Sequence, residues 1–279
     1  MTAEPFSLDL QLSSSEMLYL QDALSLAALP GGTSADSVLA ADTASTWRLA
    51  GLNALRARNL IYDDHAARQM VVDRMLAGML IACGEARKAI FVERSGANEA
   101  QSSSCLHMHH ALAVVHRRER PGIDRFIALF DETTIATQFR QEVPLASTGT
   151  HTLAPIKLAR QTFGAVLDAL GAGQTMQALD VLTNAEHTVQ AASAEALLQA
   201  LVQPHMHISV MAVATTDAPG QQKYARTFLL IDTPEGVWLI ELDQDATTTT
   251  VGRITREQAY AQLDQLIANV SSFSDESQV

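Results

Sequence analysis

The segment from residue 89 to residue 143 gives the clearest pattern of secondary structure in the chain. Its apolar runs read AIFVE (89–93), ALAVVH (111–116) and FIALF (126–130). Short runs of β-branched and aromatic residues separated by turn residues such as Pro121-Gly122 predict strands. Ile135 and Phe139 then recur with the period of a helix. We therefore expect a three-stranded antiparallel meander followed by a closing helix.

The same order of elements returns after residue 207. The second set of runs reads ISVMAV (208–213), TFLLI (227–231), a PEG turn (234–236) and WLIEL (238–242). A helix through Ala259, Leu263 and Leu266 closes it. Amphipathic helical patterns precede each set. The pattern predicts an α+β fold of two pseudo-symmetric halves, each with helices followed by a three-stranded antiparallel meander and a closing helix.

Turn-forming residues gather at 144–155, which reads PLASTGTHTLAP and is interpreted as a linker. It separates a first half, 1–143, from a second half, 156–270, that opens with a helix at Ile156. Residues 271–279 form a polar tail, and the halves are expected to build one compact body. The polar stretch SGANEAQSSS at 95–104 is expected to be a mobile loop.

Composition indicates a globular protein with no basic platform. Hydrophobic residues make up 47% of the 279 residues, charged residues 18%, and the formal net charge is −12. Such a surface argues against nucleic acid or an anionic membrane as partner. Two cysteines are too few for a disulfide framework, and neither a secretory signal nor an apolar run of roughly twenty residues is visible. We expect a cytoplasmic protein.

Histidines occur as two pairs, each placed where a strand is expected to begin. Residues two apart on a strand share a face, so each pair lies side by side. Four imidazoles brought together could hold zinc or copper. The pairs occupy non-equivalent strands of the two halves, however, so we expect no metal and no cofactor. The metal-ligand alternative comprises His107, His109, His205 and His207.

Four arginines surround the Pro121-Gly122 turn. A guanidinium cluster at a hairpin tip suits an acidic patch of a partner protein, whereas the other interpretation is a solvated tip that discourages edge-to-edge strand pairing. The candidate partner-binding residues are Arg117, Arg118, Arg120 and Arg125.

No Gly-x-Ser-x-Gly elbow, P-loop or His-Glu-x-x-His motif is present in the sequence. This favours a non-enzymatic binding protein. The alternative is a histidine-dependent metal-binding protein or metalloenzyme.

The layout resembles the EspG-type chaperones of type VII secretion over residues 6–270. The best local match is the helix from Trp47 into the short extended piece at Leu60-Ile61, then the helix at 72–83 and the strand at 89–93. The resemblance implies a central antiparallel sheet with helical bundles. It also implies a non-enzymatic cytosolic protein that binds helical tips of secreted partners. It transfers no site residue. We therefore expect a secretion-chaperone-like module that holds a helical segment of a partner protein.

Overall fold

The computed structural model describes residues 8–26, 29, 41–64, 66, 68–96, 99–185, 191–215, 222–243 and 247–273. Helices and antiparallel strands both abound, so the α+β prediction is confirmed. The chain divides into two compact units. The first comprises Met1–Ala89 and Ser103–Phe139, and the second comprises Ile90–Ser102 and Arg140–Val279.

The first unit is a sheet in the order β1-β7-β6-β5, with helices and a separate β2–β3 hairpin. The Ser13–Glu16 capping box begins α1, and the Asp73 carboxylate caps α3. Its elements are β1 (Leu8–Ser13), α1 (Ser14–Ala23), α2 (Ala41–Ala57), β2 (Ile61–Asp64), β3 (Gln69–Val72), α3 (Arg74–Glu85), β5 (Glu99–His109, of which residues from Ser103 lie here), β6 (Leu112–Arg120), β7 (Ile123–Leu129) and α4 (Glu132–Glu142, to Phe139).

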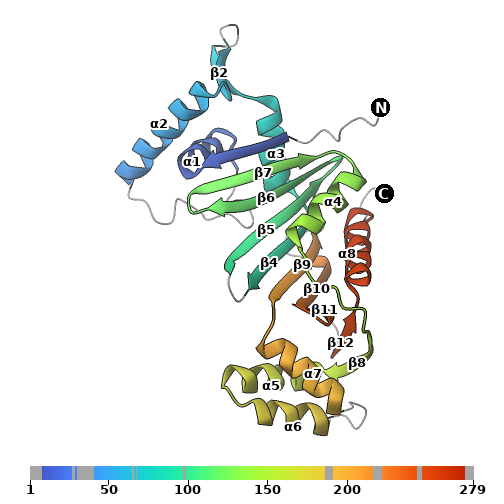
Figure 1. Cartoon of the computed structure of the whole chain (residues 1–279). Coiled ribbons are helices and arrows are strands. Elements are labelled where there is room, and N and C mark those ends of the chain that lie inside the picture. Colours follow the sequence, from blue (N-terminus) through green and yellow to red (C-terminus); the bar gives the residue numbers. More distant parts are fainter. Residues whose placement is uncertain are drawn as a thin grey trace. The chain divides into compact units, whose positions relative to one another are not determined.

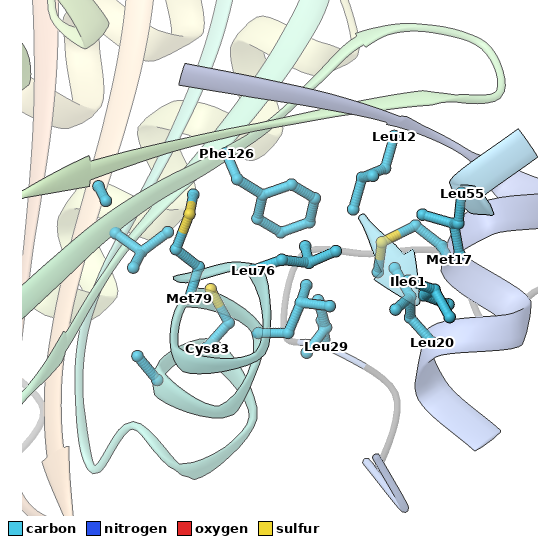
Figure 2. Close-up of a cluster of buried hydrophobic side chains, with 14 residues drawn as sticks. Leu12, Met17, Leu20, Leu29, Leu55, Ile61, Leu76, Met79, Cys83 and Phe126 are labelled. Atoms are coloured by element: carbon cyan, nitrogen blue, oxygen red, sulfur yellow. The ribbon is translucent and has the colours of Figure 1, made fainter. Parts of the chain in front are cut away.

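The core of the first unit lies between α3 and the sheet. Phe126 on β7 and Leu12 on β1 point into the same interior as Leu76 and Met79 of α3 (Figure 2). Both Phe126 and Leu12 are fully buried. Burying each such side chain contributes roughly 1.5–3 kcal/mol, so this face holds the sheet and the helix together.

The second unit is a sheet in the order β4-β9-β10-β11-β12-β8. Helices α5, α6 and α7 lie side by side as a small bundle (the yellow helices in Figure 1) and share a core with Trp238, Ile240 and Val251. Its elements are β4 (Lys88–Gly96, from Ile90), β8 (Leu153–Ala159), α5 (Arg160–Gly171), α6 (Thr175–Ala185), α7 (Ala191–Val202), β9 (Met206–Thr215), β10 (Gln222–Thr233), β11 (Gly236–Asp243), β12 (Thr248–Ile254) and α8 (Arg256–Ser271).

The order of elements repeats along the chain. A strand, three helices, four consecutive strands and a closing helix occur twice, with β2–β3 as an addition in the first half. In each half the opening strand pairs antiparallel with the last of the four strands, β1 with β7 and β8 with β12. Each meander therefore has one strand more than the three expected.

Within the two meanders, strands β5 and β12 were not expected from the sequence. β4 extends to Gly96 and β5 begins at Glu99, so the prediction of a mobile loop at 95–104 is wrong. Of that stretch, only residues 97–98 lie outside the described part. Polar side chains do not prevent a strand whose backbone is paired, and β4 and β5 are hydrogen-bonded neighbours in the sheet. Their polar side chains also contact each other, because Arg94 Nε donates to Ser102 Oγ at 2.5 Å. The Thr-rich strand β12 was also missed. Of the expected polar tail, residues 274–279 lie outside the described residues.

The expected linker is fastened to the second unit. The buried Asp232 carboxylate accepts hydrogen bonds from the backbone N–H groups of Ala146 and Ser147, at 2.7 and 3.1 Å. A Cβ on Gly149 would lie 2.0 Å from the carbonyl oxygen of Glu235, so only glycine allows this approach. We refer to residues 143–149 as the clamped segment.

The Tyr260 hydroxyl also holds the clamped segment: it donates to the carbonyl of Val143 and accepts from the N–H of Leu145, each at 3.2 Å. Further on, the expected linker end and the helix start at Ile156 are replaced by β8, and α5 begins at Arg160. Within the described ranges, no helix is long and apolar enough to cross a membrane.

Candidate partner-binding site

The arginine-bearing hairpin is formed by β6 and β7. Gly122 takes a φ of +81° in the turn, a conformation that glycine adopts without strain. Arg117 lies directly opposite Arg125 across the ladder, and Arg118 lies opposite Asp124. Directly opposed residues share a face of the sheet, so the arginines divide between its two faces.

Carboxylates within the unit engage three of the four arginines. Arg125 Nε donates to Asp9 Oδ1 at 2.8 Å, and a second guanidinium nitrogen contacts Glu119 at 3.4 Å. Arg117 also pairs with Glu119, at 3.1 Å. The hydrogen bonds that Arg125 donates to Asp9 hold the pKa of the Asp9 carboxyl below its ordinary value. The pairing leaves little net positive charge on this face of the hairpin.

The other two arginines differ in exposure. Arg118 lies 4.0 Å from the buried Asp124. Arg120 is exposed at the end of β6 and forms no ion pair within the described part of the chain. Of the predicted partner-binding arginines, Arg120 is the one whose charge the described residues leave uncompensated.

The predicted metal-ligand histidines are distributed over both units. His107 and His109 lie on β5 of the first unit, whereas His207 lies on β9 and His205 just before it in the second. Among the described residues no three His, Cys, Asp or Glu side chains are grouped as metal ligands. The structure therefore offers no support for the metal alternative.

His107 is a buried core residue. It has no exposed surface, it lies opposite Val114, and its Nε2 has no hydrogen-bond partner among the described residues. Burial, with a smaller effect of His116, lowers its pKa from 6.5 to about 3. His107 is therefore neutral at physiological pH.

A second buried histidine was not singled out from the sequence. His116 Nε2 lies 3.1 Å from Asp124 Oδ1, and its ring stacks on Phe126 at a centroid distance of 4.5 Å. Only the β6–β7 register brings these residues together, and the sequence offered no signal for it. The pair satisfies a buried carboxylate in the core.

The second unit contains a cleft of about 910 Å³ at the C-terminal end of α7. No pattern in the sequence marks it. One wall comes from α7 and the residues that follow it, and the other from the β10–β11 turn. The lining residues are Ser95, Gly96, Ala196, Gln199, Ala200, Val202, Gln203, Pro204, His205, His207, Thr233, Pro234, Glu235, Trp238 and Arg253.

Three of the lining residues, His207, Trp238 and Arg253, belong to one cross-strand row, whose fourth member, Ile231, is fully buried. His207 pairs with Ile231, Ile231 with Trp238, and Trp238 with Arg253. Because directly opposed residues share a face, all four lie on the face that packs against the helical bundle. The row is apolar in the middle and polar at both ends.

Both polar ends of the row carry unsatisfied nitrogens. Arg253 Nε and His207 Nε2 are buried and have no hydrogen-bond partner among the described residues. The Arg253 guanidinium lies 5.8 Å from the centre of the Trp238 ring. Burial lowers the pKa of His207 below its ordinary value. Unsatisfied buried donors are uncommon in folded proteins, and they indicate a place where a ligand can supply acceptors.

Comparison with known proteins gives a likeness of fold. A similar solved structure is that of the Mycobacterium tuberculosis type VII secretion system chaperone EspG5 in complex with a PE25-PPE41 dimer. The match has a TM-score of 0.65 and covers 94% of this chain and 96% of the matched chain, at 11% sequence identity. No family model and no curated protein matches the sequence. At this sequence identity the likeness shows the fold alone.

Proposed function

We propose that the chain is a non-enzymatic, chaperone-like module of the cytosol that holds a helical segment of a partner protein. The observation that carries the proposal is the match of fold over nearly the whole length to a chaperone solved with a bound protein dimer. The sequence supports it, because it contains no recognisable catalytic motif.

The repeated order of elements also supports a chaperone-like module. Type VII secretion was the expectation from layout, and internal duplication remains our proposal for how the two halves arose. The pairing of β1 with β7 and of β8 with β12 supports that proposal, because the opening strand takes the same place in both halves. A scaffold of this kind presents sheet and helix surfaces to a partner.

The cleft of the second unit is our first candidate for the binding surface. Its volume of about 910 Å³ suits a few side chains of an inserted segment. Gln199 on α7 and Gln203, which directly follows it, are exposed at its wall and can contact such a segment, while Trp238 lies on its floor. Apolar contacts would supply affinity, and the polar side chains of His207 and Arg253 would fix the position of the inserted segment along the cleft.

The arginine-bearing hairpin is the second candidate. Arg117, Arg118 and Arg125 already lie near carboxylates, so a partner would have to replace existing ion pairs. Arg120 is exposed and can pair with an acidic residue of a partner at no such cost. We therefore assign Arg120 the main role in any contact at this hairpin.

The test is a native pull-down of the chain from its own cells, with captured proteins identified by mass spectrometry. Gln203→Trp places a bulky ring at the cleft, and Gln262→Trp places the same ring on an exposed position of α8 outside it. We expect one defined helical partner with the wild type and with Gln262→Trp, and its loss with Gln203→Trp.

The hairpin is tested in the same experiment with Arg117, Arg118 and Arg120 each changed to Ser. Loss of the partner in these variants alone would move the binding surface to the hairpin. Recovery of the wild-type chain without a stoichiometric partner would contradict the proposed function.

A further inference from the structure

We propose that the cleft floor is a carboxylate-binding site, and that it takes an Asp or Glu side chain of an acidic segment of the partner protein. This inference rests on the proposed function for the identity of the occupant. It concerns Arg253 and His207, neither of which the sequence indicated as partner-binding.

The position of Arg253 prepares it for an anion. Its guanidinium lies over the Trp238 ring at 5.8 Å, a contact that orients the group while leaving the N–H donors at its edge available. Its Nε is buried without a hydrogen-bond partner among the described residues. A planar guanidinium matches a carboxylate through two parallel hydrogen bonds.

His207 supplies a donor at the other end of the row. Its buried Nε2 is also unsatisfied among the described residues, and the lowered pKa leaves the ring neutral at pH 7. A neutral imidazole with its proton on Nε2 donates one hydrogen bond. A carboxylate-bearing segment that enters the cleft over Trp238 would thus meet one donor on each side of that ring.

The charges around the cleft favour an acidic occupant over a basic one. Arg253 is the one permanent cation among the lining residues and Glu235 the one carboxylate. Glu235 is exposed in the β10–β11 turn and forms no ion pair with Arg253 in the described structure. In a chain of net charge −12, this leaves a local positive group facing a largely uncharged pocket.

The first experiment needs no knowledge of the partner. The Arg253 Nε resonance of the ¹⁵N-labelled full chain is followed by NMR during titration with N-acetyl-glutamate amide, and in parallel with N-acetyl-glutamine amide. We expect a saturable shift with the glutamate probe at millimolar concentrations, and none with the glutamine probe. No shift, or equal shifts with both probes, would overturn the proposal.

Variants link the site to the partner. Arg253→Met keeps the aliphatic stem over Trp238 and removes the donors, while Arg256→Met removes an exposed guanidinium that contacts Glu257 outside the cleft. With the captured partner, Arg253→Met should weaken binding about tenfold to a hundredfold, and Arg256→Met should leave it unchanged.

The outcomes separate this inference from the proposed function. If a partner is captured but Arg253→Met binds it normally, the carboxylate site is wrong and the chaperone-like function stands. If the glutamate probe binds and no partner is captured, the site stands and the proposed function fails. Melting temperatures of both Met variants within a few degrees of the wild type would confirm that folding is intact.

Discussion

The arginine-bearing hairpin of the first unit and the cleft floor of the second are both polar, but their polar groups are in opposite states. In the hairpin, four arginines that the sequence makes obvious divide between the two faces of the sheet, and carboxylates lie near three of them. In the cleft, a single guanidinium and a single imidazole carry buried nitrogens without partners. The buried Nδ1 of His116 in the hairpin also has no partner among the described residues, so the two regions differ chiefly in whether their guanidinium groups are paired with carboxylates.

The difference shows why a count of charges is a poor guide to a binding site. An exposed ion pair contributes little free energy, because both groups are already well solvated. A buried donor without an acceptor has lost its water and gains most when a ligand supplies one. Arg253, which forms no ion pair among the described residues, therefore gains more from a carboxylate of a partner than Arg117 or Arg125 does.

The largest expected effect comes from the wall of the cleft. Asp232 precedes the lining residues Thr233, Pro234 and Glu235 and holds the clamped segment. Asp232→Ala should leave two backbone N–H groups without acceptors and lower the free energy of unfolding by about 2–4 kcal/mol. The measurement is urea denaturation followed by circular dichroism.

Asp168→Ala is the matched control, because Asp168 is exposed on α5. Its effect should stay within about 0.5 kcal/mol. Equal unfolding free energies for the two variants would show that the clamped segment does not stabilise the wall.

The next prediction compares two buried imidazoles. The folded-state pKa of His107 is lowered to about 3. As pH falls below 6.5, the imidazole of His107 is therefore protonated in the unfolded chain while it stays neutral in the folded chain. The free energy of unfolding should therefore decrease with falling pH between about 6.5 and 3, by about 2 kcal/mol at pH 5. His107→Leu should remove this part of the acid sensitivity.

His207→Leu should change the pH dependence less, since His207 is only partly buried at the cleft. The measurement is the unfolding free energy of the wild type and both variants at several pH values from 7 to 5. If His107→Leu kept the full wild-type slope, the imidazole of His107 would not be the origin of the acid sensitivity.

A smaller effect is expected for the hairpin ion pair. Arg125→Met removes the bond to Asp9 and should cost about 1 kcal/mol or less, because both partners are partly exposed. The pKa of Asp9 is lowered in the folded state, so the contribution is present above pH 4 and is lost as pH falls through the folded-state value. Thermal melts at low and high salt should differ for the wild type more than for the variant.

The smallest effect on stability is expected for Arg120→Ser. Arg120 is exposed and forms no ion pair within the described ranges, so the melting temperature should remain within about 2 °C. The effect of this change on partner binding should be smaller than that of Gln203→Trp. A larger effect would reverse the ranking of the two surfaces.

Much of the fold could be predicted from the sequence, because apolar runs such as FIALF and WLIEL carry their own strand signal. β5 was missed because its first residues, EAQSSS, are mostly polar and form no apolar run. β12 was missed because a Thr-rich run lacks the bulk that distinguishes a buried strand.

The candidate site was harder to predict than the fold. The sequence shows Arg253 as one arginine near a glycine, with nothing to mark it. Only the register of β9, β10, β11 and β12 places it in one row with Trp238, Ile231 and His207. Likewise, the neutralisation of Arg125 by Asp9 depends on a pairing of strands more than a hundred residues apart.

Binding of the partner protein at the cleft of the second unit can be measured by hydrogen exchange of the free chain and of the captured complex. We expect slower exchange in the complex at the end of α7, the start of β9 and the β10–β11 turn, with unchanged exchange at the tip of the β6–β7 hairpin. Protection confined to that hairpin, with the cleft segments exchanging as in the free chain, would contradict binding at the cleft.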